Sequence, residues 1–182
     1  MNKSMICERQ NYELTMKSMK KFGGFTLVEL LVVVAIIAVL IGVILVNFNP
    51  FAWGQKSRDA MRIQNLEDTH RAMALALADG EVGLAATVDC TGCTTVSGSM
   101  AVDGSGWVKF SVPIGKTGLA KYWPTLFADS LNNGPYVYVY GATDKDYELN
   151  AVLESPDNAA RMSTDGGNAQ EVLEVGTSLT IL

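Results

Sequence analysis

The sequence predicts an α+β fold: a long N-terminal helix, interrupted near Pro50, packed on an antiparallel sheet of about four strands. A nearly uninterrupted apolar run over residues 25–48 predicts the first half of the helix. Apolar side chains that recur every three or four residues up to about residue 79 predict the second half. Short alternating apolar segments in the second half of the chain predict the sheet.

Charge is distributed unevenly along the chain. Residues 1–24 carry five basic and two acidic side chains, a net of +3, which leaves −8 for residues 25–182 because the whole chain carries −5. A basic N-terminal segment, an apolar run and an acidic body predict a single-pass membrane protein with its N-terminal leader in the cytoplasm and its body exported. The acidic body argues against non-specific nucleic-acid binding, which requires clustered Lys and Arg.

The apolar run is long enough to cross a membrane. From Phe25 to Phe48 only Thr26, Glu29 and Asn47 are polar. As a helix these residues would rise about 36 Å, against a hydrocarbon core of about 30 Å. Periodicity leaves open an uncleaved signal anchor and a secretory signal cut after Gly54, although the run is long for a secretory signal and contains an acid.

Glu29 is the feature that neither alternative explains. A carboxylate at the start of an apolar run costs on the order of a few kcal/mol in lipid unless it is paired. Cleavage after Gly24 would create a cationic amine on Phe25, four residues away, which could neutralise Glu29 in the same chain or in a neighbouring one. Thr26 adds a hydroxyl to the same polar cluster.

Residues 24–30, GFTLVEL, behind a basic leader resemble the type III signal sequence of type IV prepilins and pseudopilins. The resemblance implies that prepilin peptidase cuts between Gly24 and Phe25 and that the new amine of Phe25 is methylated. It implies that Glu29, with Thr26 beside it, pairs with that amine of an adjacent subunit in a homo-oligomeric filament built on an inner-membrane assembly platform. The predicted leader is longer than the shortest of the family and contains two Glu and one Cys.

These observations divide the chain into four parts. We expect a cleaved leader over residues 1–24, a transmembrane and filament-core helix over 25–48, an exposed amphipathic half of the helix over 49–80 and a globular head over 81–182. Pro50 predicts a kink or local melting around residues 47–50, or a simple membrane-exit boundary. His70 lies on the apolar stripe of the second helix and is expected to be packed there, since no second metal ligand is evident nearby.

The head begins with a Gly-rich loop over residues 81–106 that contains Cys90 and Cys93. A disulfide between them is expected, with free thiols as the alternative, because a redox pair would open a helix in a βαβ unit and a zinc site would need two more ligands. Alternation predicts a strand at 108–112, a hairpin of 136–140 with 147–154, and an edge hairpin of 171–175 with 178–182. The tyrosine-rich strand, apolar on both faces, is expected to be a central strand.

Residues 124–135 are similar to the equivalent stretch of the major pseudopilins of type II secretion, in which a loop can bind calcium. Asp129, Asn132 and Asn133 supply the hard oxygen donors that calcium requires, and they are also ordinary turn formers. No other cofactor is expected.

The leading functional hypothesis is a structural filament subunit that passes from the lipid bilayer into helix packing. The alternative is a minor pilin that binds a surface, a sugar or DNA, with Trp107, Tyr122 and Trp123 as an aromatic surface; packing in the core explains these rings as well. An enzyme is rejected, because no Walker loop, metal constellation or nucleophile–base spacing occurs in the sequence.

Overall fold

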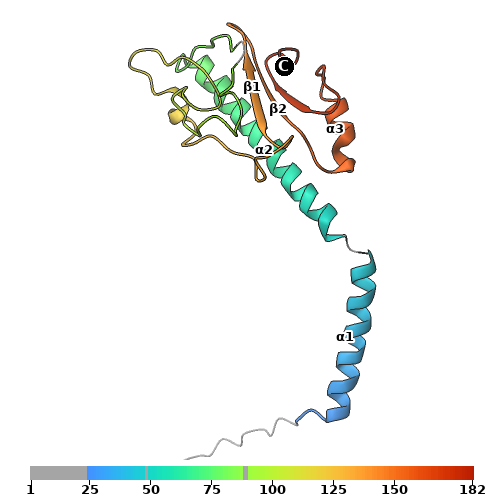
Figure 1. Cartoon of the computed structure of the whole chain (residues 1–182). Coiled ribbons are helices and arrows are strands. Elements are labelled where there is room, and N and C mark those ends of the chain that lie inside the picture. The colour runs from blue at the N-terminus through green and yellow to red at the C-terminus, as the bar shows by residue number, and fades with distance from the viewer. Residues whose placement is uncertain (1–23, 48, 88–89) are drawn as a thin grey trace, which may run out of the picture. The chain divides into compact units, whose positions relative to one another are not determined.

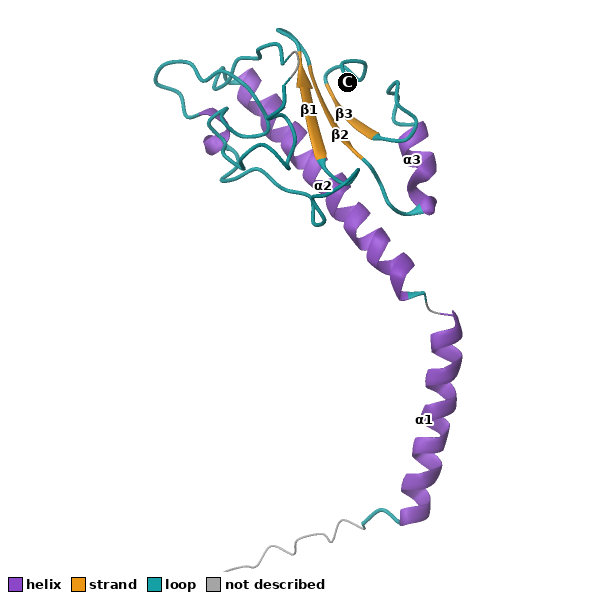
Figure 2. Ribbon diagram, in the orientation of Figure 1, coloured by secondary structure: helices purple, strands orange, loops and turns teal. Residues whose placement is uncertain are grey.

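The computed structural model describes residues 24–47, 49–87 and 90–182, so residues 1–23 of the predicted leader, which include Cys7, lie outside the described residues. The chain forms two compact units, residues 1–48 and 49–182. Figure 1 follows the chain from the N-terminal helix into the head, and Figure 2 shows its helices and strands. The α+β fold class predicted from the sequence is confirmed.

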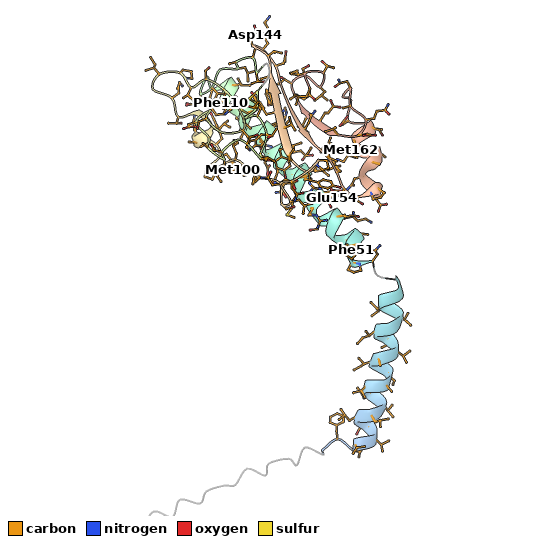
Figure 3. The ribbon with its side chains drawn as sticks, in the orientation of Figure 1. Phe51, Met100, Phe110, Asp144, Glu154 and Met162 are labelled. Carbon is orange, nitrogen blue, oxygen red and sulfur yellow. A yellow bond between two sulfur atoms is a disulfide. The ribbon has the colours of Figure 1, made fainter. Side chains whose placement is uncertain are left out.

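The first unit contains α1, Leu27–Asn47. Its large apolar side chains from Leu27 to Ile44 project from the helix on all sides (Figure 3), and each is at least 43 % exposed. Within the described residues, this is the one helix whose length and hydropathy would suit a membrane crossing.

The second unit begins with α2, Pro50–Ala78, and local signals set both of its ends. Asn49 is extended, and its side-chain oxygen accepts hydrogen bonds from the backbone N–H groups of Phe51 and Ala52 at 3.1 and 3.3 Å. Proline follows at the first helical position, where it costs no hydrogen bond. Gly80, at φ +63°, ends the helix, and the N–H of Glu81 donates to the carbonyl of Ala76 at 2.8 Å. The predicted interruption near Pro50 is therefore the boundary between two helices.

The sheet has three antiparallel strands in the order β1-β2-β3: Tyr138–Ala142, Tyr147–Ala151 and Leu173–Gly176. The predicted hairpin is β1–β2, and Thr143 closes its turn by accepting from the N–H of Asp146 at 2.9 Å. The expected fourth strand is absent from the described residues. Residues 108–112 contribute only an isolated bridge between Ser111 and Gly83, and residues 178–182 form no strand.

One face of the sheet packs on α2. The inward side chains of β1 and β2 include three tyrosines that are at most 1 % exposed, and they meet Leu66 and Met73 of the helix in a single core. Burial of such a continuous apolar face is the main source of stability in a small head. A short helical segment follows β2, formed by η2 (Pro156–Asn158) and α3 (Ala159–Ser163), and η1 (Gly118–Lys121) contacts α2.

Candidate functional site

The N-terminal site lies at the start of α1. Gly24 and Phe25 precede the helix, and Phe25 is 78 % exposed. Thr26 caps the helix, because its hydroxyl oxygen accepts a hydrogen bond from the backbone N–H of Glu29 at 3.1 Å. Sequence reasoning assigned the Thr26 hydroxyl only to a polar cluster, although the spacing Thr-x-x-Glu before an apolar run is the signal of a capping box.

This cap has a direct consequence for Glu29. It holds Glu29 in the first turn of α1, where the partial positive charge of the helix N-terminus favours a carboxylate. The described helix begins two residues after Phe25, so an amine created on Phe25 would be four residues from Glu29 in the chain and just before the helix.

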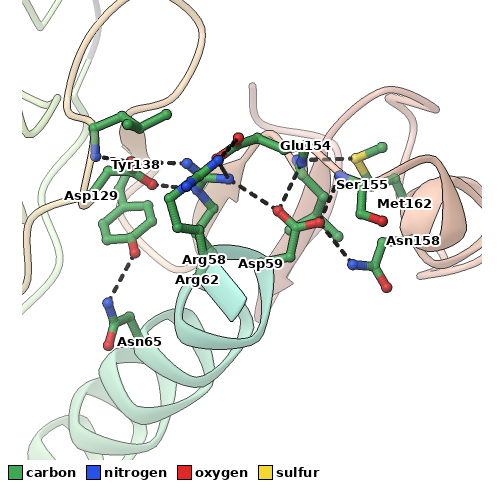
Figure 4. Close-up of polar contacts among 12 residues, drawn as sticks. Arg58, Asp59, Arg62, Asn65, Asp129, Tyr138, Glu154, Ser155, Asn158 and Met162 are labelled. Atoms are coloured by element: carbon green, nitrogen blue, oxygen red, sulfur yellow. Dashed lines mark hydrogen bonds and ion pairs between the residues drawn. The ribbon is translucent and has the colours of Figure 1, made fainter. Parts of the chain in front are cut away.

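The most extensive polar site is buried in the head, and we call it the Arg62 cluster: Arg58, Asp59, Arg62, Asp129 and Glu154. Figure 4 shows Arg62 at its centre. Its guanidinium donates through Nε and Nη2 to the two carboxylate oxygens of Asp129 and through Nη1 to Asp59 at 3.0 Å, and Nη1 lies 2.6 Å from Glu154. Arg62 is 1 % exposed and also lies over the ring of Tyr136, 4.9 Å from its centroid.

The other members join α2 to the segment after β2. Arg58 donates twice to Glu154, at 2.8 and 2.6 Å, in a bidentate pair. Asp59, fully buried, accepts the backbone N–H groups of Glu154 and Ser155 and the side-chain amide of Asn158, each at 2.8 Å. The cluster therefore fastens one helix to two distant segments of the head.

Ionisation in the cluster follows from these contacts. Burial opposes ionisation of Asp129, but the hydrogen bonds and the charge of Arg62, together with the backbone N–H groups of Leu131 and Asn132, outweigh it and lower the pKa of this carboxyl below its ordinary value. The hydrogen bonds from Arg58 lower the pKa of Glu154. Sequence reasoning missed this cluster, because charged residues on a helix are usually solvated and nothing local marks their partners.

The three residues considered as calcium ligands, Asp129, Asn132 and Asn133, make hydrogen bonds to other protein groups in and near the Arg62 cluster. Besides Arg62, Asp129 accepts the N–H groups of Leu131 and Asn132 at 2.8 and 3.3 Å. The Asn132 amide donates to the carbonyl of Thr95 at 3.1 Å, and the carbonyl of Asn133 accepts the N–H of Tyr136 at 3.0 Å. Among the described residues, no group of three or more His, Cys, Asp or Glu is arranged to hold a metal ion. Asp129 is thus the partner of an arginine in this structure.

Cys90 and Cys93 form a disulfide, with their Cα atoms 5.4 Å apart. The chain directly after it lies along the outer edge of β1: Tyr140 donates its N–H to the carbonyl of Cys93 at 2.9 Å, and Thr95 donates to the carbonyl of Tyr138 at 3.1 Å. In the strand order β1-β2-β3 the central strand is β2, so the expectation that the tyrosine strand is central is wrong. β1 is an edge strand, and the disulfide loop covers the backbone groups that the edge would otherwise expose.

The other singled-out rings are packed. The hydroxyl of Tyr147 lies 3.0 Å from Nδ1 of His70, and burial lowers the pKa of this histidine. Trp107 is fully buried and donates to the carbonyl of Phe127 at 3.0 Å. Tyr122 and Trp123 are partly buried against the core. These positions favour packing over an aromatic binding surface.

Comparison with known proteins identifies one family feature. Residues 19–45 match the family described as "Prokaryotic N-terminal methylation motif". No curated protein and no solved structure matches the chain. The matched residues span the predicted cleavage position, Glu29 and most of α1, as the resemblance noted in the sequence implies.

Proposed function

We propose that this chain, which carries the prepilin-type methylation motif on a pilin-like fold, is a structural protein and not an enzyme: the subunit of a type IV pilus-like or type II secretion pseudopilus filament. Prepilin peptidase removes residues 1–24, and the amine of Phe25 is methylated. The mature subunit is anchored in the inner membrane with its head exported, until the assembly platform transfers it into the filament.

The observation that carries this proposal is the coincidence of the motif with a helix whose large apolar side chains are exposed. Residues 27–44 have a mean hydropathy of 3.2, and none of them is buried. Such a helix requires lipid or other helices around it, and a filament core supplies the second environment once the subunit leaves the first.

Glu29 and Thr26 are proposed to act together in assembly. When the helix leaves the lipid bilayer for a core of packed helices, Glu29 remains in an apolar environment. An unpaired carboxylate is costly there. The amine of Phe25, in the same or an adjacent subunit, neutralises it. Thr26 fixes the first turn, so that Glu29 meets the amine from a defined position.

The test is the intact mass and N-terminal residue of the protein recovered from cells that express a prepilin peptidase. The proposal expects a chain that begins at N-methyl-Phe25. A chain that begins at Met1 would be an uncleaved anchor, and one that begins at Gln55 would be a secreted domain; either result would overturn the proposal. A Gly24→Val variant, which crowds the cleaved bond, should stay uncleaved and serves as the matched control.

A further inference from the structure

Two glutamates lie together on the face of the sheet that is turned away from α2. Glu148 of β2 and Glu174 of β3 are 0 % and 3 % exposed. Asn150 pairs with Glu174, and Glu148 pairs with Gly176, so the two glutamates are diagonal neighbours on adjacent strands. Both side chains are therefore buried on the same face of neighbouring strands.

The end of the chain covers this pair. The backbone N–H groups of Ile181 and Leu182 donate to Oε2 of Glu148 at 2.6 and 3.1 Å. The N–H of Ala169 donates to Oε2 of Glu174 at 2.9 Å. Gly167 passes so close that a Cβ there would lie 1.9 Å from the same oxygen. Water is therefore largely excluded from both carboxyl groups.

No cation among the described residues balances this pair. The ion pairs that the structure describes join Lys and Arg to other carboxylates, and Asp165, which also acts on Glu174, is itself acidic. Oε1 of Glu148 is buried without a donor. Two ionised carboxylates buried on neighbouring strands would repel each other in a medium of low dielectric constant.

We propose that Glu148 and Glu174 form a buried proton-binding site, in which Glu174 carries the proton and donates it to the unpartnered Oε1 of Glu148. One proton removes one negative charge and supplies the missing donor. Glu148 is the acceptor of the pair because its Oε1 lacks a donor, whereas its Oε2 receives two N–H groups and the oxygens of Glu174 receive the N–H of Ala169 and the side-chain amide of Asn168. The pair then holds residues 181–182 against the outer face of the sheet.

The electrostatics of Glu174 agree with this arrangement. Burial raises the pKa of Glu174, and the carboxyls of Glu148 and Asp165 raise it further, against the hydrogen bond from Ala169. A carboxyl whose pKa is raised on folding contributes stability below its unfolded pKa and loses that contribution as the pH rises through the folded pKa. Alkaline pH should therefore loosen the chain end from the sheet.

The experiment uses the full chain in detergent micelles. Infrared spectra at about pH 7 should contain the C=O stretch of a protonated carboxylic acid, although exposed carboxyls are ionised at that pH. The band should be lost in Glu174→Gln and in Glu148→Gln. Glu171→Gln, which removes an exposed acid from the same segment, should retain it.

Thermal unfolding gives the second readout. Between about pH 6 and about pH 9 the melting temperature of the wild type should fall, whereas that of Glu174→Gln should stay level, because the amide replaces the proton permanently. An absent band, or equal pH dependence in the two proteins, would overturn the proposal. So would a rise in melting temperature on adding calcium that disappears in Glu174→Gln, since a metal ion would then occupy the pair. None of these results depends on cleavage or filament assembly.

Discussion

Arg62 and Asp129 lie 67 residues apart in the chain and meet inside the head as a bidentate ion pair, each with a side chain 1 % exposed. Two further carboxylates, of Asp59 and Glu154, surround the same guanidinium. Arginine suits this position because its planar fork satisfies several acceptors at once and stays charged when buried. The pair ties the first half of α2 to the loop that precedes β1.

Removing one partner should reveal how strongly the pair couples these segments. Asp129→Ala leaves the Arg62 guanidinium buried without its bidentate partner, which should lower the free energy of unfolding by about 3–5 kcal/mol. Denaturant unfolding of the full chain in detergent micelles measures this change in the free energy of unfolding. The exposed pair of Lys56 with Asp157 supplies the control, since Asp157→Ala should change stability by less than about 1 kcal/mol. Equal effects of the two variants would contradict a structural role for the buried pair.

Acid should destabilise the head through the same cluster. The lowered pKa values of Asp129 and Glu154 mean that their contribution is present above the unfolded pKa and lost as the pH falls through the folded pKa. The melting temperature should therefore drop below about pH 4. Asp129→Asn should be less stable near neutral pH and show a shallower acid drop. An acid drop of the same steepness in that variant would assign the loss to other carboxyls.

The disulfide should protect the edge of β1. In the chain-entropy account, opening so short a loop costs about 2 kcal/mol, and the segment after Cys93 should detach more readily. Hydrogen exchange on the reduced protein should be faster at the amide of Tyr140, which donates to the carbonyl of Cys93. Amides between β2 and β3 provide the internal control. If they accelerate equally, reduction loosens the whole sheet rather than its edge.

Glu29→Ala should separate processing from assembly. The peptidase would still cut after Gly24, because the bond and its flanking glycine are unchanged, but the amine of Phe25 would lose its counter-charge in the filament core. Cleavage is followed by mass, and assembly by the amount of protein in sheared filaments. Glu171→Ala, an equivalent change at an exposed position of the head, should assemble normally. Normal filament yield from Glu29→Ala would remove the pairing argument.

Much of the fold was predictable because its signals are local. The ends of α2 follow from Asn49-Pro50 and Asp79-Gly80, and the β1–β2 hairpin follows from alternation around a polar turn. The expected strand at 108–112 shows where this reasoning fails. Its alternation is real, since Val108 and Phe110 are buried in the core. The segment nevertheless forms no strand, because its pairing with another segment is limited to the bridge between Ser111 and Gly83. Alternation predicts burial, whereas strand formation also requires a neighbour.

By itself the sequence determined the membrane-length helix, the methylation motif and the position of Glu29, because each is set by residues that follow one another in a single continuous segment. Only the tertiary structure decided which charges are buried and which edge is covered. Arg62 pairs with Asp129, and Glu148 is buried on the strand next to Glu174, although the members of each pair are far apart in the chain, and no local pattern distinguishes these side chains from solvated ones. Their free energies depend on desolvation and on partners that are adjacent only after the chain has folded.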